Sequence, residues 1–291
     1  MNIHPLAVVS PSAELDPDVR IGPLCVIESG VTIGPGCILE SCVVIKEGTT
    51  LGANNRVFEG AVLGGLPQHA HMPENPGQVV IGSGNTIREN VTVHRALEAD
   101  HVTVIGHGNL LMANAHVAHD CRIGNHTILT NNAMLGGHVT VDDRAYLSGA
   151  VGIHQFCRIG SLAMVGGQAH INKDVPPYVT IDGLSSLVVG LNQIGLRRAG
   201  YDTETIRQLK VAYRVIYRSG LTWSEILRRL KSECCAGPAA AFYKFLSATA
   251  RGIVAERRAP PQATIRLRTD VETAGDLPIV EPLPERRAMA G

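Results

Sequence analysis

Aliphatic residues recur at every sixth position over most of residues 9–171. Stepping by six from Val9 reaches only Val, Ile or Leu as far as Leu63, and does so again from Ile105 to Ile171. The position four residues after each aliphatic is usually small, most often Ala, Val, Cys or Thr. Self-similarity at a fixed short period predicts a solenoid, in which each repeat covers the apolar face of its neighbour.

This pattern resembles the hexapeptide repeat of left-handed parallel β-helices. The resemblance implies a triangular coil of three hexads, with the aliphatic residue filling the core and the small residue where the walls come close. Successive coils would stack at about 4.8 Å, as neighbouring strands do. We therefore expect a mainly β fold, with a left-handed parallel β-helix over residues 1–190 and loop insertions at 64–78 and 95–101, where the register breaks.

The last third of the chain changes character. We expect the paired prolines between Asp174 and Tyr178 to end the solenoid, because proline cannot donate to a strand ladder. A small α-helical C-terminal domain should follow over 191–256. Asp202 can cap its first long helix, Thr222 with Glu225 forms a capping box, and Gly237-Pro238 can open a third helix. Residues 257–291 lack periodicity and are predicted to be a disordered tail.

Composition excludes several classes of protein. The formal charge is zero, which gives no global attraction to nucleic acid or to an acidic membrane. No apolar run is long enough to span a bilayer, and the first residues lack the layout of a signal peptide. We expect a cytoplasmic protein without integral membrane contact. Four of the seven cysteines take the small core position, so inert core thiols are favoured over disulfides or a metal site: Cys25, Cys37, Cys121 and Cys157.

The segment NAHVAHDC, residues 114–121, predicts a reactive site. Within an unbroken solenoid, residues one coil apart stack on the same wall, so His119 should lie beside Gly137 and Asp120 beside His138. We expect Asp120 to pair with His138, and Asp120 or another carboxylate to hold His119 in one tautomer. A neutral imidazole can accept a proton near pH 7, and a glycine leaves its N–H open to an oxyanion. Direct acyl transfer to a hydroxyl or an amine fits these groups.

Plainer interpretations remain open for each feature. An outward histidine on a solenoid is often only solvated. A zinc site, as in hexapeptide carbonic anhydrases, would bring two histidines five apart, and no pair here has that spacing. The insertion at 64–78 could reach over a ligand with Gln68, His69 and His71, or it could be a tolerated insertion.

Basic residues gather after the solenoid. Residues 195–260 hold thirteen Lys/Arg against five Asp/Glu, whereas residues 1–194 hold nine against sixteen. A stripe of one sign follows one helical face, and ordinarily such a stripe is only the solvated face. With Arg197 nearby it suits an acidic partner better; its members are Arg207, Lys210, Arg214 and Arg218.

Several motifs identify a family resemblance over about residues 4–255. The segments IRENVTVHR, NLLMANAHVAHDC, LGGHVTVDD, VGIHQFCRIG, MVGG, DVPPY and VIYRSG resemble those of the UDP-N-acetylglucosamine acyltransferases that begin lipid A synthesis in Gram-negative bacteria. The resemblance implies a homotrimer with sites in clefts between β-helices, and no cofactor. It implies transfer of a 3-hydroxyacyl chain from acyl carrier protein to the 3-hydroxyl of UDP-N-acetylglucosamine.

The same resemblance implies roles for individual residues. His119 matches the general base, and Gly137 the oxyanion donor. Gly167 matches the position that limits acyl length, and the basic helices would receive the carrier protein. Further positions match residues at or lining the substrate cleft: Asp120, His116, His138, His154, Gln155, Gln68, His94, Asn192 and Arg198. The chain departs from the family pattern at His69 and His71, where Asp and Lys are usual, and at Ala199, where a second Arg is usual.

These departures leave the acceptor open, since some relatives acylate a 3-amino sugar. An acetyl-coenzyme-A-dependent sugar acetyltransferase would use the same scaffold. The related lipid A N-acyltransferase is disfavoured because the hexads begin almost at once. A solenoid that only binds ligands is the non-enzymatic alternative.

Overall fold

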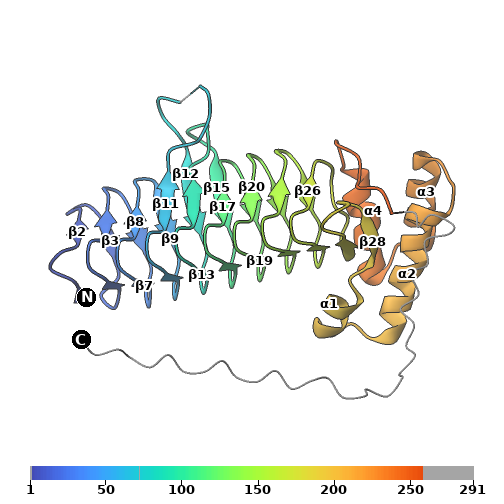
Figure 1. The fold of residues 1–291 in the computed structure, drawn as a ribbon, viewed down its shortest axis with the longest axis horizontal. Coiled ribbons are helices and arrows are strands. Elements are labelled where there is room, and N and C mark those ends of the chain that lie inside the picture. The colour runs from blue at the N-terminus through green and yellow to red at the C-terminus, as the bar shows by residue number, and fades with distance from the viewer. Residues whose placement is uncertain (1, 72, 258–291) are drawn as a thin grey trace, which may run out of the picture. The chain divides into compact units, whose positions relative to one another are not determined.

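The computed structural model describes residues 2–71 and 73–257, and these form a long β-helix with helices at its C-terminal end (Figure 1). Short strands from successive coils pair into three sheets, which form the walls of the β-helix. Apart from the last strand of the first wall, the strands within each wall are parallel. The first wall contains β1 (Asn2–Ile3), β4 (Arg20–Ile21), β7 (Ile38–Leu39), β10 (Arg56–Val57), β13 (Thr86–Ile87), β16 (Leu110–Leu111), β19 (Ile128–Leu129), β22 (Tyr146–Leu147), β25 (Met164–Val165), β27 (Val179–Ile181) and β28 (Val188–Leu191).

The other two walls are built in the same way. The second wall contains β2 (Val8–Val9), β5 (Val26–Ile27), β8 (Val44–Ile45), β11 (Val62–Gly65), β14 (Thr92–His94), β17 (His116–Val117), β20 (Met134–Leu135), β23 (Gly152–Ile153) and β26 (His170–Ile171). The third wall contains β3 (Glu14–Leu15), β6 (Thr32–Ile33), β9 (Thr49–Leu51), β12 (Gln78–Ile81), β15 (Val102–Ile105), β18 (Arg122–Ile123), β21 (Thr140–Val141) and β24 (Arg158–Ile159).

The hexad residues form the core, as the sequence predicts. Aliphatic side chains such as Ile27 and Leu39 are completely buried, and Cys25 and Cys37 fill small positions between them. At the corners the backbone turns through the left-handed region, for example at Asn114 (φ 60°). This is the conformation that asparagine tolerates better than most residues. The left-handed parallel β-helix predicted from the repeat is confirmed.

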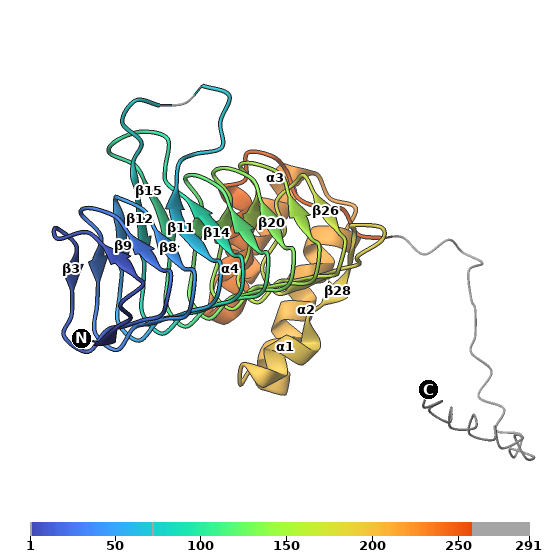
Figure 2. The same ribbon diagram turned by 60° about the vertical axis from the view of Figure 1, so that its left-hand side comes forward.

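Both predicted insertions leave the β-helix at the corner between the second and third walls (Figure 2). Partner residues on adjacent coils are normally 18 apart, but Arg56 pairs with Thr86 and Thr86 with Leu110 across the insertions. The two loops are joined to each other, because Gly77 N–H donates to Ala96 O at 2.8 Å and Arg95 Nε donates to Gly77 O at 2.6 Å. The insertions therefore form one raised structure beside a single corner.

The paired prolines do not end the solenoid, contrary to our expectation. Val175 still bridges Ile159, and β27 pairs in parallel with β25 before β28 returns antiparallel to it. The prolines occupy the turn between Val175 and β27, where no N–H is required for a ladder. The β-helix thus continues for most of another coil.

Helices then cover the end of the β-helix: α1 (Gln193–Arg198), α2 (Thr203–Arg218), α3 (Trp223–Glu233) and α4 (Ala240–Ser247), with a 3-10 turn at Gly237–Ala239. Asp202 caps α2 through Thr205 N–H, and the predicted capping box opens α3. The short α1 was not predicted. The third predicted helix begins as the 3-10 turn. Within the described residues, no helix is long and apolar enough to span a bilayer.

The described chain ends by returning to the β-helix. Asp174 bridges Ile253, and Arg257 N–H donates to Val188 O at 2.8 Å. Arg257 is therefore anchored, although the sequence placed it in the disordered tail. The rest of that predicted tail, 258–291, lies outside the described residues.

Candidate active site

The predicted patch is present at the corner that carries the two insertions. His119 and Asp120 follow β17, and Gly137 and His138 follow β20 on the next coil. His138 N–H donates to His119 O at 3.0 Å, which joins the two turns directly. The rings of His119 and His138 meet edge to face, with centroids 5.2 Å apart.

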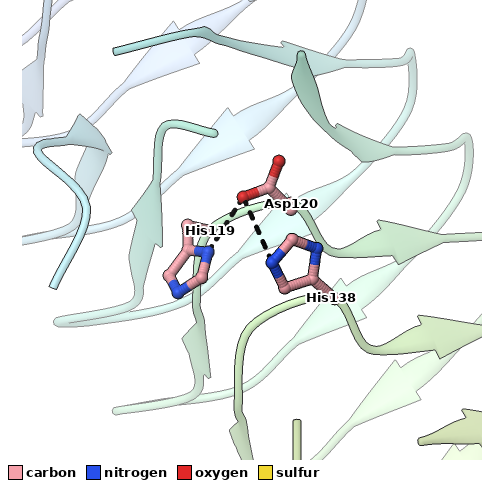
Figure 3. A group of neighbouring side chains, drawn as sticks. All are labelled: His119, Asp120 and His138. Atoms are coloured by element: carbon pink, nitrogen blue, oxygen red, sulfur yellow. Dashed lines mark hydrogen bonds and ion pairs between the residues drawn. The ribbon is translucent and has the colours of Figure 1, made fainter. Parts of the chain in front are cut away.

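Asp120 orients His119 (Figure 3). The distance from His119 Nδ1 to Asp120 Oδ2 is 2.9 Å, and only 8% and 6% of the two side chains are exposed. Because an ionised carboxylate can only accept, Nδ1 carries the proton and Nε2 keeps its lone pair. Nε2, which would be the basic nitrogen of the neutral imidazole, therefore lies on the side of the ring away from Asp120.

The predicted pairing of Asp120 with His138 is present as a contact at ion-pair distance (Figure 3). His138 Nε2 lies 3.8 Å from Asp120 Oδ2, which is beyond hydrogen-bonding distance. The His138 ring also stacks on Phe156, with centroids 4.5 Å apart and planes 7° apart. The hydrogen bond of this carboxylate oxygen goes to His119.

Further donors surround the Asp120 carboxylate. Leu97 N–H donates to Oδ2 at 3.1 Å, and His101 Nδ1 lies 3.3 Å from Oδ1. Burial opposes ionisation, but the hydrogen bonds from His119 and Leu97 and the charge of His138 hold the pKa of the Asp120 carboxyl below its usual value. Asp120 is thus an anion that can stabilise a protonated His119.

Gly137 is packed against the His119 ring. An ideal Cβ at Gly137 would lie 2.6 Å from His119 Nε2, closer than real Cβ atoms come to other atoms. Its carbonyl accepts from Phe156 N–H, but its own N–H has no acceptor among residues 2–71 and 73–257. Gly137 therefore lies against the His119 ring, and its N–H is not used by another residue of the described chain.

His119, Asp120 and His138 could also hold a cation by distance alone, since one potential ligand atom of each lies within 4.8 Å of the others. The hydrogen bond between His119 Nδ1 and Asp120 Oδ2 already uses one atom of each residue. A proton between these two atoms accounts for the 2.9 Å geometry, and a zinc ion would have to displace it.

A second histidine pair lies on the same wall. The rings of His94 and His116 are 5.1 Å apart, and His116 Nδ1 lies 2.8 Å from Thr92 Oγ1. His94 Nδ1 donates to Leu66 O at 2.6 Å. Burial, reinforced by the charge of His94, lowers the pKa of His116 to about 4. His116 therefore stays neutral near pH 7.

This low pKa predicts an acid-dependent loss of stability. Folded His116 binds a proton only near pH 4, whereas an unfolded histidine does so near 6.5. The unfolded state thus binds more protons between these values, and stability falls as the pH drops from 6.5 to 4. Urea unfolding at pH 7.5 and 4.5 should show a larger loss for wild type than for His116→Asn. Equal losses in the two proteins would contradict this assignment.

The comparisons with known proteins cover nearly all of the described chain. Residues 12–47 and 103–137 match the bacterial transferase hexapeptide model, and residues 174–254 match the model of the second domain of Udp N-acetylglucosamine O-acyltransferase. An acyl-[acyl-carrier-protein]–UDP-N-acetylglucosamine O-acyltransferase of Janthinobacterium sp. is 45% identical over 258 residues, 87% of this chain and 98% of the relative. The chain belongs to this acyltransferase family.

Solved structures agree. The UDP-N-acetylglucosamine acyltransferase of Francisella novicida superposes with a TM-score of 0.85 at 38% identity, over 87% of this chain and 94% of that one. The UDP-N-acetylglucosamine O-acyltransferase of Moraxella catarrhalis gives 0.84 at 37% identity, over 87% and 100%. The acyltransferase fold therefore extends through both the β-helix and the helical domain.

The first insertion brings His69 to His119. Its ring meets the His119 ring edge to face at 5.8 Å, while His71 N–H donates to His69 Nδ1 at 3.2 Å. A cavity of about 510 Å³ opens between the two loops, lined by His69, His71, Pro73, Glu74, Asn75, Leu97, Glu98 and Ala99. The two residues that depart from the family pattern, His69 and His71, thus line a cavity near His119.

Other predicted residues lie nearby or further along. Gln68 is exposed on the loop, and Gln155 lies one coil beyond Gly137, with its carbonyl 3.1 Å from His154 Nδ1. Gly167 is exposed at the corner between the first and second walls, over Gly149. Their roles toward a substrate stay predictions.

Within the described part of one chain, neither Asn192 nor the basic residues of α1 and α2 form a hydrogen bond or an ion pair with His119. Asn192 Oδ1 caps α1, and its Nδ2 donates to Leu162 O at 2.9 Å. Arg197 and Arg198 are exposed on α1. On α2, Arg207 pairs with Glu204 and Arg218 with Glu256, whereas Lys210 and Arg214 have no acidic partner among the described residues.

Sequence reasoning missed His101, Leu97 and Thr92. Leu97 comes from the second insertion, where no repeat fixes a position. Thr92 is 24 residues from His116 because that insertion lengthens the coil. Counting coils across the insertions would have found Thr92, and counting back one coil from His119 would have pointed to His101, but no signal pointed to Leu97.

Proposed function

We propose that this chain transfers a 3-hydroxyacyl group from acyl carrier protein to the 3-hydroxyl of UDP-N-acetylglucosamine. The names of its relatives give O-acyl transfer from acyl carrier protein to this nucleotide sugar. The observation that carries this proposal is the packing of His119 between Asp120 and Gly137. Asp120 fixes the proton on Nδ1, and Gly137 packs against the same ring with an N–H that has no acceptor in the described chain. These are a base and an oxyanion donor at adjacent positions.

The reaction follows from these two groups. His119 Nε2 removes the proton from the sugar hydroxyl as its oxygen attacks the thioester carbonyl. The carbonyl electrons move to oxygen, and Gly137 N–H donates to that oxyanion. When the tetrahedral intermediate collapses, the C–S bond breaks and His119 returns the proton to the departing thiolate. Asp120 stabilises His119 while it is charged, as a carboxylate does for a catalytic imidazolium.

We also propose that the chain works as a homotrimer. Large apolar side chains around the site remain open in the single chain, with Leu66 54%, Met134 50% and Phe156 51% exposed. Exposed apolar patches of this kind commonly mark a protein interface. A neighbouring copy would cover them and close the cleft, which light scattering of the purified protein can measure.

The experiment is a product assay. The purified protein is incubated with UDP-N-acetylglucosamine and hydroxyacyl carrier proteins of several chain lengths, and the nucleotide sugar is analysed by mass spectrometry. We expect one hydroxyacyl addition that mild alkali removes, as for an ester. An alkali-stable product with a 3-amino sugar would instead support an amine acceptor. No acylated sugar with any donor would refute acyl transfer.

The basic stripe gives a prediction about the carrier protein. Lys210 and Arg214 are the members free of acidic partners in the described chain, so they should contribute most to an acidic surface. Reversing both to Glu should weaken carrier-protein binding at least tenfold at low salt, measured by calorimetry. The matched control is Arg20→Glu on β4, at the other end of the β-helix. Equal affinities for both proteins would contradict the assignment.

A further inference from the structure

We infer that His101 is a positioning residue that fixes Asp120 for the His119 base. This inference rests on the proposed function and adds a loop residue to the catalytic pair. His101 lies at the end of the second insertion, directly before β15 and 18 residues before His119. Its contact with Asp120 therefore joins the end of the insertion to the site.

The two oxygens of Asp120 are held by different parts of the chain. Oδ2 accepts from His119 Nδ1 at 2.9 Å and from Leu97 N–H at 3.1 Å. Oδ1 faces His101 Nδ1 at 3.3 Å, and His101 is its sole donor among residues 2–71 and 73–257. Removing the His101 ring would leave half of a buried carboxylate without a protein partner, free to rotate away from His119.

The insertion anchors this carboxylate twice. Leu97 and His101 come from the same loop, and His101 N–H donates to Glu98 O at 2.9 Å, which closes the loop on itself. Thr103 Oγ1 accepts from Asp120 N–H at 2.8 Å just beyond the loop. The insertion therefore acts as a clamp on Asp120, and it also lines the cavity between the two loops.

The contact between His101 and Asp120 should make activity depend on whether His101 is protonated. About half of the His101 side chain is exposed and only 6% of Asp120, so His101 can exchange protons with solvent while Asp120 is enclosed. Asp120 is also faced by His119 and, at 3.8 Å, by His138, and His69 packs on His119 from the first loop. The loop's acidic residues, Glu98 and Asp100, form no ion pair with His101 in the described structure.

His101 and His119 thus contact the same carboxylate. A proton on His101 draws on the same negative charge that would stabilise a proton on His119, so it opposes protonation of His119. Removing the charge of His101 should move the acid limb of the kcat profile to higher pH.

The test uses His101→Ala and His101→Asn in the full-length protein. The amide nitrogen of Asn lies near the place of Nδ1, so it can still donate but does not titrate. We expect His101→Ala to lower kcat about fivefold with KM within twofold, and His101→Asn to recover most of kcat. Both variants should move the acid limb upward by about half a pH unit. The control is His126→Asn, an exposed histidine at another corner.

The ring resonances of His119 give a second readout that needs no substrate. Their titration midpoint, followed by NMR, should rise in His101→Asn and stay unchanged in His126→Asn. An unmoved midpoint and an unmoved acid limb would overturn the inference, even if His101→Ala were less active. A raised midpoint in a protein that acylates no sugar would support the His101 contact and refute the proposed function instead.

Discussion

Replacing His119 with alanine should lower kcat about a thousandfold while KM changes little. The reason is that general-base catalysis by a positioned side chain contributes about 10²- to 10⁴-fold, and this contribution is made in the transition state. His119 Nε2 is the nitrogen that Asp120 leaves free to accept a proton. The measurement is steady-state transfer from hydroxyacyl carrier protein, with folding checked by circular dichroism.

His126→Asn is the control for this variant. His126 is exposed at a left-handed corner position, with φ 55°, which Asn also tolerates. It should transfer acyl groups at the wild-type rate. A His119→Ala protein that kept more than a tenth of the wild-type kcat would show that another group removes the proton.

Gly137→Ala should be nearly as damaging, with kcat lowered about a hundredfold or more. The added methyl group would lie 2.6 Å from His119 Nε2, so the imidazole must move away from the reacting atoms. The same methyl group would crowd the approach to the free N–H, and loss of one oxyanion donor alone costs about 10²- to 10³-fold. Overpacking should also destabilise the fold by about 2 kcal/mol.

Gly149→Ala is the matched control for steric effects. Gly149 also lies in a corner without positive φ, but its Cβ would come no closer than 3.6 Å to another atom. It should melt at the wild-type temperature. A Gly137→Ala protein with wild-type kcat would mean that neither the His119 position nor the Gly137 N–H matters for transfer.

Much of the fold follows from one regularity. Every sixth side chain must be buried, and this requirement fixes the three walls. The coil length of 18 residues then places Gly137 over His119, whatever the side-chain torsions are. Helix caps such as Asp202 could also be predicted from the sequence, because a side chain at a helix start accepts a hydrogen bond from a free N–H a few residues later. Local rules and fixed periods therefore carried the prediction.

The failures arise where neither rule applies. Coil stacking brought Asp120 and His138 together as predicted, but it left open whether Asp120 or another carboxylate holds His119. The insertions changed the coil length, which hid the Thr92–His116 contact and a buried ladder from Asn55 through Asn85 to Asn109. The short α1, with Gly195 in its middle, has too few residues for a helical period to appear.

The most direct test is a crystal structure of the protein with bound UDP-N-acetylglucosamine or its acylated product. The account predicts the glucosamine 3-oxygen within about 3.2 Å of His119 Nε2. It also predicts the acyl carbonyl oxygen of the product within hydrogen-bonding distance of Gly137 N–H, with Asp120 still bonded to His119 Nδ1. A nucleotide sugar bound with its 3-oxygen well beyond reach of His119, and with another side chain in contact with that oxygen, would contradict it.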